Sequence, residues 1–187
     1  MADMKDFQAF TDTYPEKISP EFLPEETLKR IAEEIDKPYA EFLREHGIAG
    51  YDNGFIWSVN PYEFTEVIAS WGLNEKTDHV IARTAFGDLF VSSGSGVMVM
   101  HVNYNRTTPL TTSAVYLYEL ILTDRSISGD LLFANIYDEA LKKLGPVKHD
   151  ECYGFVPAVP LGGPEDVNNL QITQMYPYLE MLAQAHE

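Results

Sequence analysis

Apolar residues recur at helical spacing in the first quarter of the chain, where they predict two helices. The recurring positions are Leu28, Ile31, Ala32 and Ile35, followed by Tyr39, Phe42 and Leu43. Pro38 interrupts the pattern and Gly47 ends it, because proline blocks helix continuation and glycine favours helix ends. Glu25 and Glu26 stand at the start, where the positive end of the helix dipole favours acids. Two acidic helices are therefore expected to open the fold.

Three more helices are predicted further along the chain. The first begins at Asn60-Pro61, ends at Gly72 and carries Phe64, Val67, Ile68 and Trp71. The second ends at Gly145-Pro146 and carries Leu131, Leu132, Ile136, Ala140, Leu141 and Leu144. The third lies near the end of the sequence and carries Tyr178, Leu179 and Leu182. In each case the spacing of three and four residues places the apolar side chains on one face of a helix.

Short runs rich in β-branched residues predict strands in the middle of the chain. The runs are 80–84, 88–91 and 97–102. Glycines between them favour tight turns, so an antiparallel meander is expected here. A turn at 51–54 precedes a short aromatic strand, and a second short strand at 153–156 precedes a loop rich in proline and glycine. The run 115–122 fits either a strand or a buried helical turn, and its pattern does not decide between them.

Helical patterns on both sides of a strand-rich middle predict an α+β fold. With 187 residues, of which 45% are hydrophobic, the chain is long enough to bury a core without disulfides or metals. We expect a single compact domain, of one lobe or two, whose central antiparallel sheet is flanked by the early acidic helices and the late helices.

The chain is strongly acidic, which changes the range of partners. It has 13 Lys and Arg against 29 Asp and Glu, a net charge of −16, and no Lys or Arg follows Lys148. Nucleic acids are held by clustered cations, so no direct contact with nucleic acid is expected. The excess of acid suits either solubility or a surface that meets a basic protein. Apolar runs stay far below the roughly 20 residues of a membrane helix, and no secretory signal opens the chain, so we expect a cytoplasmic protein with no membrane contact.

Candidate catalytic and metal-binding patterns are weak. The Gly94-Ser95-Gly96 segment lacks the Gly-Lys-Ser/Thr ending of a phosphate-binding loop and favours a hairpin turn. His149 and Cys152 are spaced like two zinc ligands, but structural zinc usually takes four. Cys152 is the only cysteine, and a lone cysteine is usually a buried apolar residue. The five histidines match no nucleophile motif. We therefore predict no catalytic residue, no metal and no cofactor.

Aromatic residues beside acids mark two predicted turns as candidate contact sites. The chain holds 11 Tyr, 10 Phe and 2 Trp, and most of these rings are expected in the core. Tyrosines are also frequent anchors of protein interfaces. The candidate partner-binding residues are Tyr51, Asp52 and Asn53 in the first turn, and Asp150, Glu151 and Tyr153 in the second.

Spaced motifs give the chain a resemblance to a bacterial family. They are Lys143-Leu144-Gly145-Pro146, Asp150-Glu151, Tyr153-Gly154-Phe155-Val156-Pro157-Ala158 and Leu161-Gly162-Gly163. This part resembles the C-terminal domain of type VI secretion immunity proteins that neutralise a DNase toxin. The order of Tyr39, Phe42, Leu43, Gly47, Gly54, Trp57 and Asn60-Pro61 is similar to the GAD-related domain that commonly precedes it. Val159-Pro160 departs from the C-terminal pattern in a loop. Gly162-Gly163 is expected to allow unusual backbone angles, and Phe155 to fill the core.

The resemblance implies an organisation and a function. It divides the chain into an N-terminal extension (1–17), a GAD-like region (18–105) and an immunity-protein region (106–187). It implies an immunity protein, not an enzyme, that binds one cognate toxin and blocks its active or DNA-binding site. The partner is then a basic nuclease, which agrees with the acidic charge. The alternative is an intracellular module that binds a small molecule or peptide, or a hydrolase that uses the acids around Asp150 and Glu151. Mimicry of DNA phosphates by carboxylates and the oligomeric state stay open.

Overall fold

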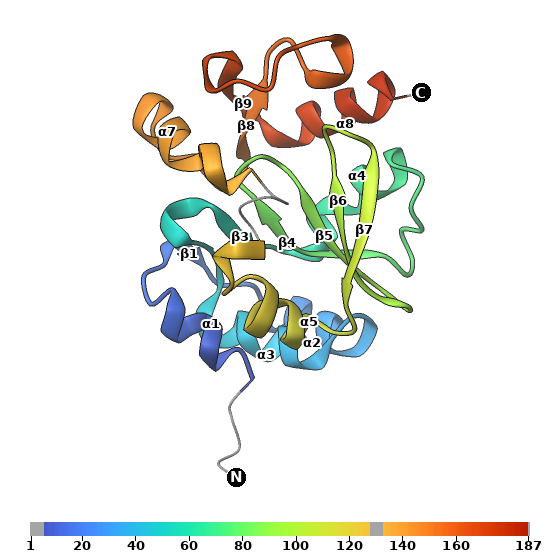
Figure 1. Ribbon diagram of the computed structural model, residues 1–187. Helices are drawn as coiled ribbons and strands as arrows, with labels where there is room; N and C mark the ends of the chain where they lie inside the picture. Colours follow the sequence, from blue (N-terminus) through green and yellow to red (C-terminus); the bar gives the residue numbers. More distant parts are fainter. Residues whose placement is uncertain (1–5, 128–132, 187) are drawn as a thin grey trace.

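The computed structural model describes residues 6–127 and 133–186. Its main element is a seven-stranded sheet whose strands lie side by side in chain order, each antiparallel to the next (Figure 1). The strands are β1 (Ile18–Glu21), β2 (Ile48–Tyr51), β3 (Ile56–Ser58), β4 (His79–Thr84), β5 (Leu89–Ser93), β6 (Gly96–His101) and β7 (Arg106–Thr111). The predicted α+β class and the antiparallel meander are confirmed.

Helices cover the sheet and join its strands. The longer ones are α1 (Gln8–Thr13), α2 (Glu25–Glu34), α3 (Lys37–His46), α4 (Thr65–Ser70), α7 (Ala134–Leu144) and α8 (Met175–Ala185). The short ones are η1 (Asp52–Gly54), η2 (Pro61–Phe64), α5 (Ala114–Tyr116), η3 (Leu117–Ile121), η4 (Val159–Leu161) and η5 (Val167–Asn169). In Figure 1, α1, α2, α3 and α5 lie at one end of the molecule, and α7 and α8 lie at the other.

The predicted break between the first two acidic helices is confirmed. Asp36 caps α3, because its carboxylate accepts a hydrogen bond of 2.7 Å from the N–H of Tyr39, and Pro38 occupies the first turn. Gly47 ends the helix at a φ of 72°, and a Cβ there would lie 2.8 Å from the carbonyl oxygen of Glu21. Only glycine combines that angle with that close approach.

Several elements differ from the sequence-based expectation. The fold does not open with the two acidic helices, because α1 and β1 precede them. Strands β2, β7 and β9 (Leu170–Gln174) were not predicted. The run 115–122 is helical and includes a π-helical turn, and the Tyr118 hydroxyl donates to the Ile81 carbonyl at 2.8 Å. The predicted helix positions Leu131 and Leu132 lie outside the described residues.

A second, two-stranded sheet forms the end of the molecule opposite α1 (Figure 1). Its strands β8 (Glu151–Phe155) and β9 are antiparallel, and α7 and α8 pack against them. The Tyr153 N–H donates to the Ala85 carbonyl at 2.8 Å, which joins this hairpin to the turn between β4 and β5. As expected, Phe155 is buried and Gly162 has a φ of 86°.

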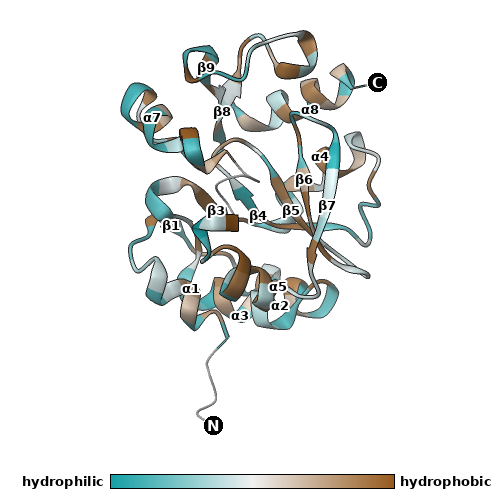
Figure 2. Ribbon diagram, viewed as in Figure 1, coloured by the Kyte–Doolittle hydropathy of each residue, from teal (hydrophilic) through white to brown (hydrophobic). Residues whose placement is uncertain are grey.

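One continuous hydrophobic core runs through the described residues and includes the central strands, α3, α7 and α8. Figure 2 shows β5 and β6 as apolar strands, while polar residues dominate the outer turns of α7. No helix among the described residues has both the length and the apolar character needed to span a bilayer. The boundaries proposed at residues 17 and 105 stay a prediction.

Candidate functional site

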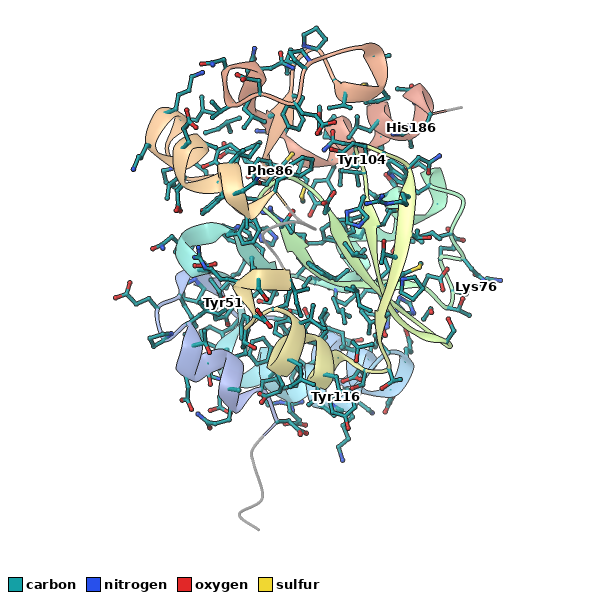
Figure 3. The ribbon with its side chains drawn as sticks, viewed as in Figure 1. Tyr51, Lys76, Phe86, Tyr104, Tyr116 and His186 are labelled. Atoms are coloured by element: carbon teal, nitrogen blue, oxygen red, sulfur yellow. The ribbon has the colours of Figure 1, made fainter. Side chains whose placement is uncertain are left out.

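The first predicted turn is largely internal. Tyr51, labelled in Figure 3, is 1% exposed. Its ring centroid lies 4.8 Å from that of Phe10 in α1. Asp52 is buried beside the Arg125 guanidinium, and burial raises the pKa of this carboxyl although Arg125 opposes the shift. Asn53 is exposed, and its carbonyl accepts a hydrogen bond of 2.6 Å from Tyr137. Only Asn53 offers its side chain freely to a partner.

The second predicted turn is more open. Asp150 is exposed, whereas Glu151 is partly buried and accepts a hydrogen bond of 3.0 Å from the Lys148 N–H. The Tyr153 ring is buried, and its hydroxyl donates to the Gly145 carbonyl at 2.6 Å. Tyr153 therefore shapes the hairpin, and Asp150 is the exposed acid of this turn.

Tyr137 of α7 brings the two turns together. Its hydroxyl holds Asn53 while its ring lies 6.1 Å from the Tyr153 ring. The two tyrosines singled out as anchors, Tyr51 and Tyr153, fill the core. Contact of these two turns with a partner stays a prediction that now falls on the exposed Asn53 and Asp150.

A buried arginine fixes the loop before Asp150. Arg83 of β4 is 0% exposed, and its guanidinium donates to the carbonyls of Lys148 at 2.9 Å and His149 at 2.8 Å. It also lies over the Trp57 ring, 4.9 Å from the centroid. Burial lowers the pKa of Arg83 to about 10, so the group remains charged at neutral pH. The central sheet thereby sets the position of His149 and Asp150.

Beside this loop lies a groove between α4 and α8, which we call the acidic groove. It has a volume of about 330 Å³ and is lined by Tyr62, Glu63, Thr65, Glu66, Val67, Tyr176 and Glu180. Three of these side chains are glutamates and none is a lysine or arginine. One wall comes from η2 and α4 and the other from α8, so the groove exists only where these three elements meet.

Hydrogen bonds organise the floor of the acidic groove. A single Glu63 oxygen accepts from the Tyr176 hydroxyl at 3.1 Å and from His149 Nε2 at 3.0 Å. The hydrogen bond from His149 lowers the pKa of the Glu63 carboxyl despite its partial burial, which keeps it ionised at neutral pH. Burial and the Glu63 charge raise the pKa of Tyr176, which therefore stays a neutral donor.

Two further carboxylates of the groove are available to a partner. Within the part of the chain that the structure describes, the carboxylates of Glu66 and Glu180 make no hydrogen bond or ion pair. Tyr62 carries the Arg30 guanidinium 4.2 Å from its ring centroid, but that cation is paired with Glu34. Carboxylates between aromatic walls suit a lysine or arginine side chain, which gains charge-assisted hydrogen bonds and contact with a ring face.

The sequence pattern predicts each wall of the acidic groove but not that the two walls meet. Glu63 and Glu66 are three residues apart, and Tyr176 and Glu180 are four apart, which places each pair on one helix face. That signal was readable. Nothing in the sequence showed that the two faces meet, because 110 or more residues separate them.

A larger cavity, of about 480 Å³, lies near the other end of the molecule. It is lined by Asp6, Lys37, Pro38, Glu41, Phe42, Arg44 and Glu45. Its charges are mixed, and Arg44 is engaged by Glu25 at 2.7 Å and also by Glu41. Its internal pairing makes it a poorer match to a charged ligand than the acidic groove.

Asp88, His101 and Thr108 form a chain that resembles a hydrolase triad. His101 Nδ1 lies 3.4 Å from an Asp88 oxygen, and His101 Nε2 lies 3.4 Å from the Thr108 hydroxyl. Asp88 and His101 are at most 1% exposed, and none of the three residues lines either groove. Asp88 and His101 therefore lie inside the core, away from both the acidic groove and the larger cavity. The second Asp88 oxygen accepts the Val102 N–H at 3.0 Å.

The metal pattern of the sequence is not assembled. His149 points to Glu63, while Cys152 is buried with its sulfur 3.4 Å from the Thr173 hydroxyl. Burial raises the pKa of the Cys152 thiol to about 11, so it is a neutral thiol at neutral pH. Among the described residues, no group of three or more His, Cys, Asp or Glu could hold a metal ion.

Comparison with known proteins gives two family matches. Residues 5–105, more than half of the chain, match the GAD-like domain, and residues 115–186 match the C-terminal domain of the type VI secretion system immunity protein Tdi1. The crystal structure of Atu4351 from Agrobacterium tumefaciens is similar, with a TM-score of 0.79 at 18% identity over 96% of this chain and 89% of that chain. At this identity the likeness shows a shared fold. A search of curated proteins found no match.

Proposed function

The chain belongs to the GAD-like family and carries the C-terminal domain of the type VI secretion immunity protein Tdi1, and from this premise we propose that it binds and neutralises one cognate effector toxin. It does so by binding, without transforming a substrate. The toxin is a DNase, and the protein acts in the cytoplasm, where the DNA to be protected lies.

The observation that carries this proposal is the acidic groove. A nuclease presents lysines and arginines to the phosphate backbone of its substrate. The groove offers Glu66 and Glu180 unpaired, beside an ionised Glu63 and two tyrosine rings. A cationic side chain of the toxin entering this groove is no longer available to DNA.

The position of the acidic groove supports an interface that covers more of the toxin than a single cationic side chain. The groove lies next to the loop that Arg83 fixes, and the exposed Asp150 of that loop adds a further carboxylate near Tyr176. Rigid carboxylates at several points steer a basic partner into place and raise its association rate. An interface of ordinary size buries on the order of 1,600 Å² in total, enough to cover a DNA path.

A charge-reversal experiment tests the role of the groove. The double variant Glu66→Lys/Glu180→Lys should weaken binding of the cognate effector at least about 30-fold, because two carboxylates that face its cations are replaced by repulsive lysines. The matched control Asp12→Lys/Glu16→Lys makes the same change in net charge on exposed residues of and beside α1, at the opposite end of the molecule. It should weaken binding no more than about threefold through long-range charge.

Surface-based kinetics would measure both variants, and thermal unfolding would confirm that both are folded. Equal affinities of the groove variant and the control would show that the groove is not where the effector docks.

A further inference from the structure

The outer edge of β9 is open. The two-stranded sheet contains β8 and β9 alone, so β9 pairs on one side only. Its opposite side faces no strand of the described chain. Three of its five residues are exposed, namely Gln171, Ile172 and Gln174, and Ile172 is 37% exposed.

The outer edge of β8, by contrast, is closed. The Tyr153 N–H donates to the Ala85 carbonyl at 2.8 Å, and the Glu151 N–H donates to the Lys148 carbonyl at 3.1 Å. The Phe155 N–H donates to the Tyr178 hydroxyl at 3.0 Å. All three outward N–H groups of β8 therefore have partners, and the free edge of the hairpin is that of β9.

The register shows which backbone groups of β9 face outward. The Met175 N–H bonds to the Asp150 carbonyl, and the Val156 N–H bonds to the Asn169 carbonyl. Hydrogen-bonded pairs alternate along an antiparallel ladder, so Ile172, opposite Tyr153, belongs to a pair that is not hydrogen-bonded. Its N–H and C=O point away from β8, and no hydrogen bond outside the ladder engages either group among the described residues.

The other two sheet edges are protected in ways that β9 is not. Edge strand β1 contains Pro20 and a register shift, and edge strand β7 contains Pro109 and a register shift. Proline and bulges prevent an edge from pairing with another chain. Strand β9 reads Leu-Gln-Ile-Thr-Gln, with no proline, charge or bulge. It is the one edge of the described sheets without such protection.

We propose that β9 accepts an extended, basic segment of the effector as an additional strand. This inference rests on the proposed function and names how the toxin is held. Backbone hydrogen bonds to Ile172 and its outward-facing neighbours supply the register of such a strand. Side chains of the added segment then project to either side of the hairpin.

Charge selects the occupant. No Lys or Arg follows Lys148, and the chain after it carries the acids Asp150, Glu151, Glu165, Asp166 and Glu180. The cations beside the hairpin are already engaged, Lys148 by Glu151 at 3.5 Å and Lys143 by the Asn168 side chain at 2.9 Å. A second copy of this chain would bring the same acids edge to edge and be repelled, whereas a segment rich in lysine and arginine is attracted. Gln174 ends β9 two residues before Tyr176, which lines the acidic groove. The β9 edge and the groove are therefore adjacent in the sequence, and one basic partner can contact both.

Ile172→Pro tests the proposal with little disturbance to the hairpin. Proline removes the outward N–H but no hydrogen bond of the β8–β9 ladder, and it is tolerated at edges. We expect about tenfold weaker binding of the effector. The control Ile172→Thr keeps the N–H and should stay within about threefold. Thermal unfolding serves as the folding control: the midpoint of Ile172→Pro should be close to that of Ile172→Thr.

Amide hydrogen exchange of the wild-type protein is a second test of the edge proposal, and it requires no variant. The Ile172 and Gln174 amides should exchange quickly in the free protein and become protected in the complex. If the effector binds but these amides stay unprotected, the edge proposal is overturned while the proposed function stands. If the wild-type protein does not bind the effector at all, both are overturned.

Discussion

At the scale of single residues, two buried polar side chains, those of Arg83 and Asp88, connect the core to the surface. Arg83 uses its guanidinium to hold the carbonyls of Lys148 and His149, so a charge that is costly to bury is matched by acceptors. Asp88 does the same for the turn after β6 by accepting the Val102 N–H. Both residues pin a loop to the sheet, and the Arg83 loop carries Asp150 toward the acidic groove.

The carboxyl of Asp88 should make stability depend on pH. Burial raises its pKa in the fold above the value of about 4 in the unfolded chain. The fold therefore favours the protonated form, and the stability that this provides is full below the unfolded pKa and lost as pH rises through the folded pKa. Asp88→Asn keeps a carbonyl oxygen for Val102 without a charge. We expect it to lose less stability than the wild type as pH rises above the unfolded pKa of aspartate.

Urea unfolding at a series of pH values would measure this difference. Parallel pH profiles for the wild type and the variant would mean that Asp88 does not hold its proton in the fold.

At the scale of elements, the loop between β8 and β9 shows how backbone contacts fix the C-terminal unit. The Gly163 N–H donates to the Ala158 carbonyl at 3.0 Å, and Asn169 donates to the carbonyls of Pro157 and Pro164 at 3.0 Å each. A Cβ at Gly163 would lie 1.8 Å from the Pro157 carbonyl oxygen. The loop therefore closes on itself through contacts that leave no room for a side chain.

Gly163→Ala should disrupt this loop. A rigid backbone oxygen cannot yield as a flexible side chain does, so we expect a loss of about 1–3 kcal/mol in the free energy of unfolding. Gly94→Ala is the matched control, because Gly94 has open space around it and lies in the exposed β5–β6 turn. Thermal unfolding of the two variants would compare them, and equal midpoints would contradict the close approach.

The elements that were predictable are those with a strong internal period. The apolar stripe from Leu28 to Ile35 predicts a helix, and the β-branched runs of β4 to β6 predict strands. Both patterns can be recognised in the sequence because a periodic apolar face must be buried. Strands β1, β7 and β9 are short and polar, and they are strands only because a neighbour supplies hydrogen bonds. For the same reason the acidic groove could not be foreseen: each wall is visible in the sequence, while their meeting depends on the packing of α4 against α8.

At the scale of the whole molecule, the net charge of −16 is distributed unequally. Acids of α2 and α3 are largely paired within the fold, as in Lys29–Glu33, Arg30–Glu34 and Arg44–Glu25. The chain after Lys148 has no lysine or arginine of its own, and of its acids Glu151 is paired with Lys148 at 3.5 Å. The segment 149–187, which includes the β8–β9 hairpin and α8, therefore has six acids and no lysine or arginine of its own. One wall of the acidic groove and the open β9 edge belong to this segment.

Titration of the purified protein into the effector, with DNA degradation as the readout, tests the central claim most directly. The account predicts that nuclease activity falls in proportion to added protein and vanishes near one-to-one stoichiometry, with both proteins chemically unchanged. Undiminished degradation in a saturating excess would contradict neutralisation by binding. Complete inhibition by a small fraction of an equivalent would contradict it as well, since only a catalyst acts far below stoichiometry.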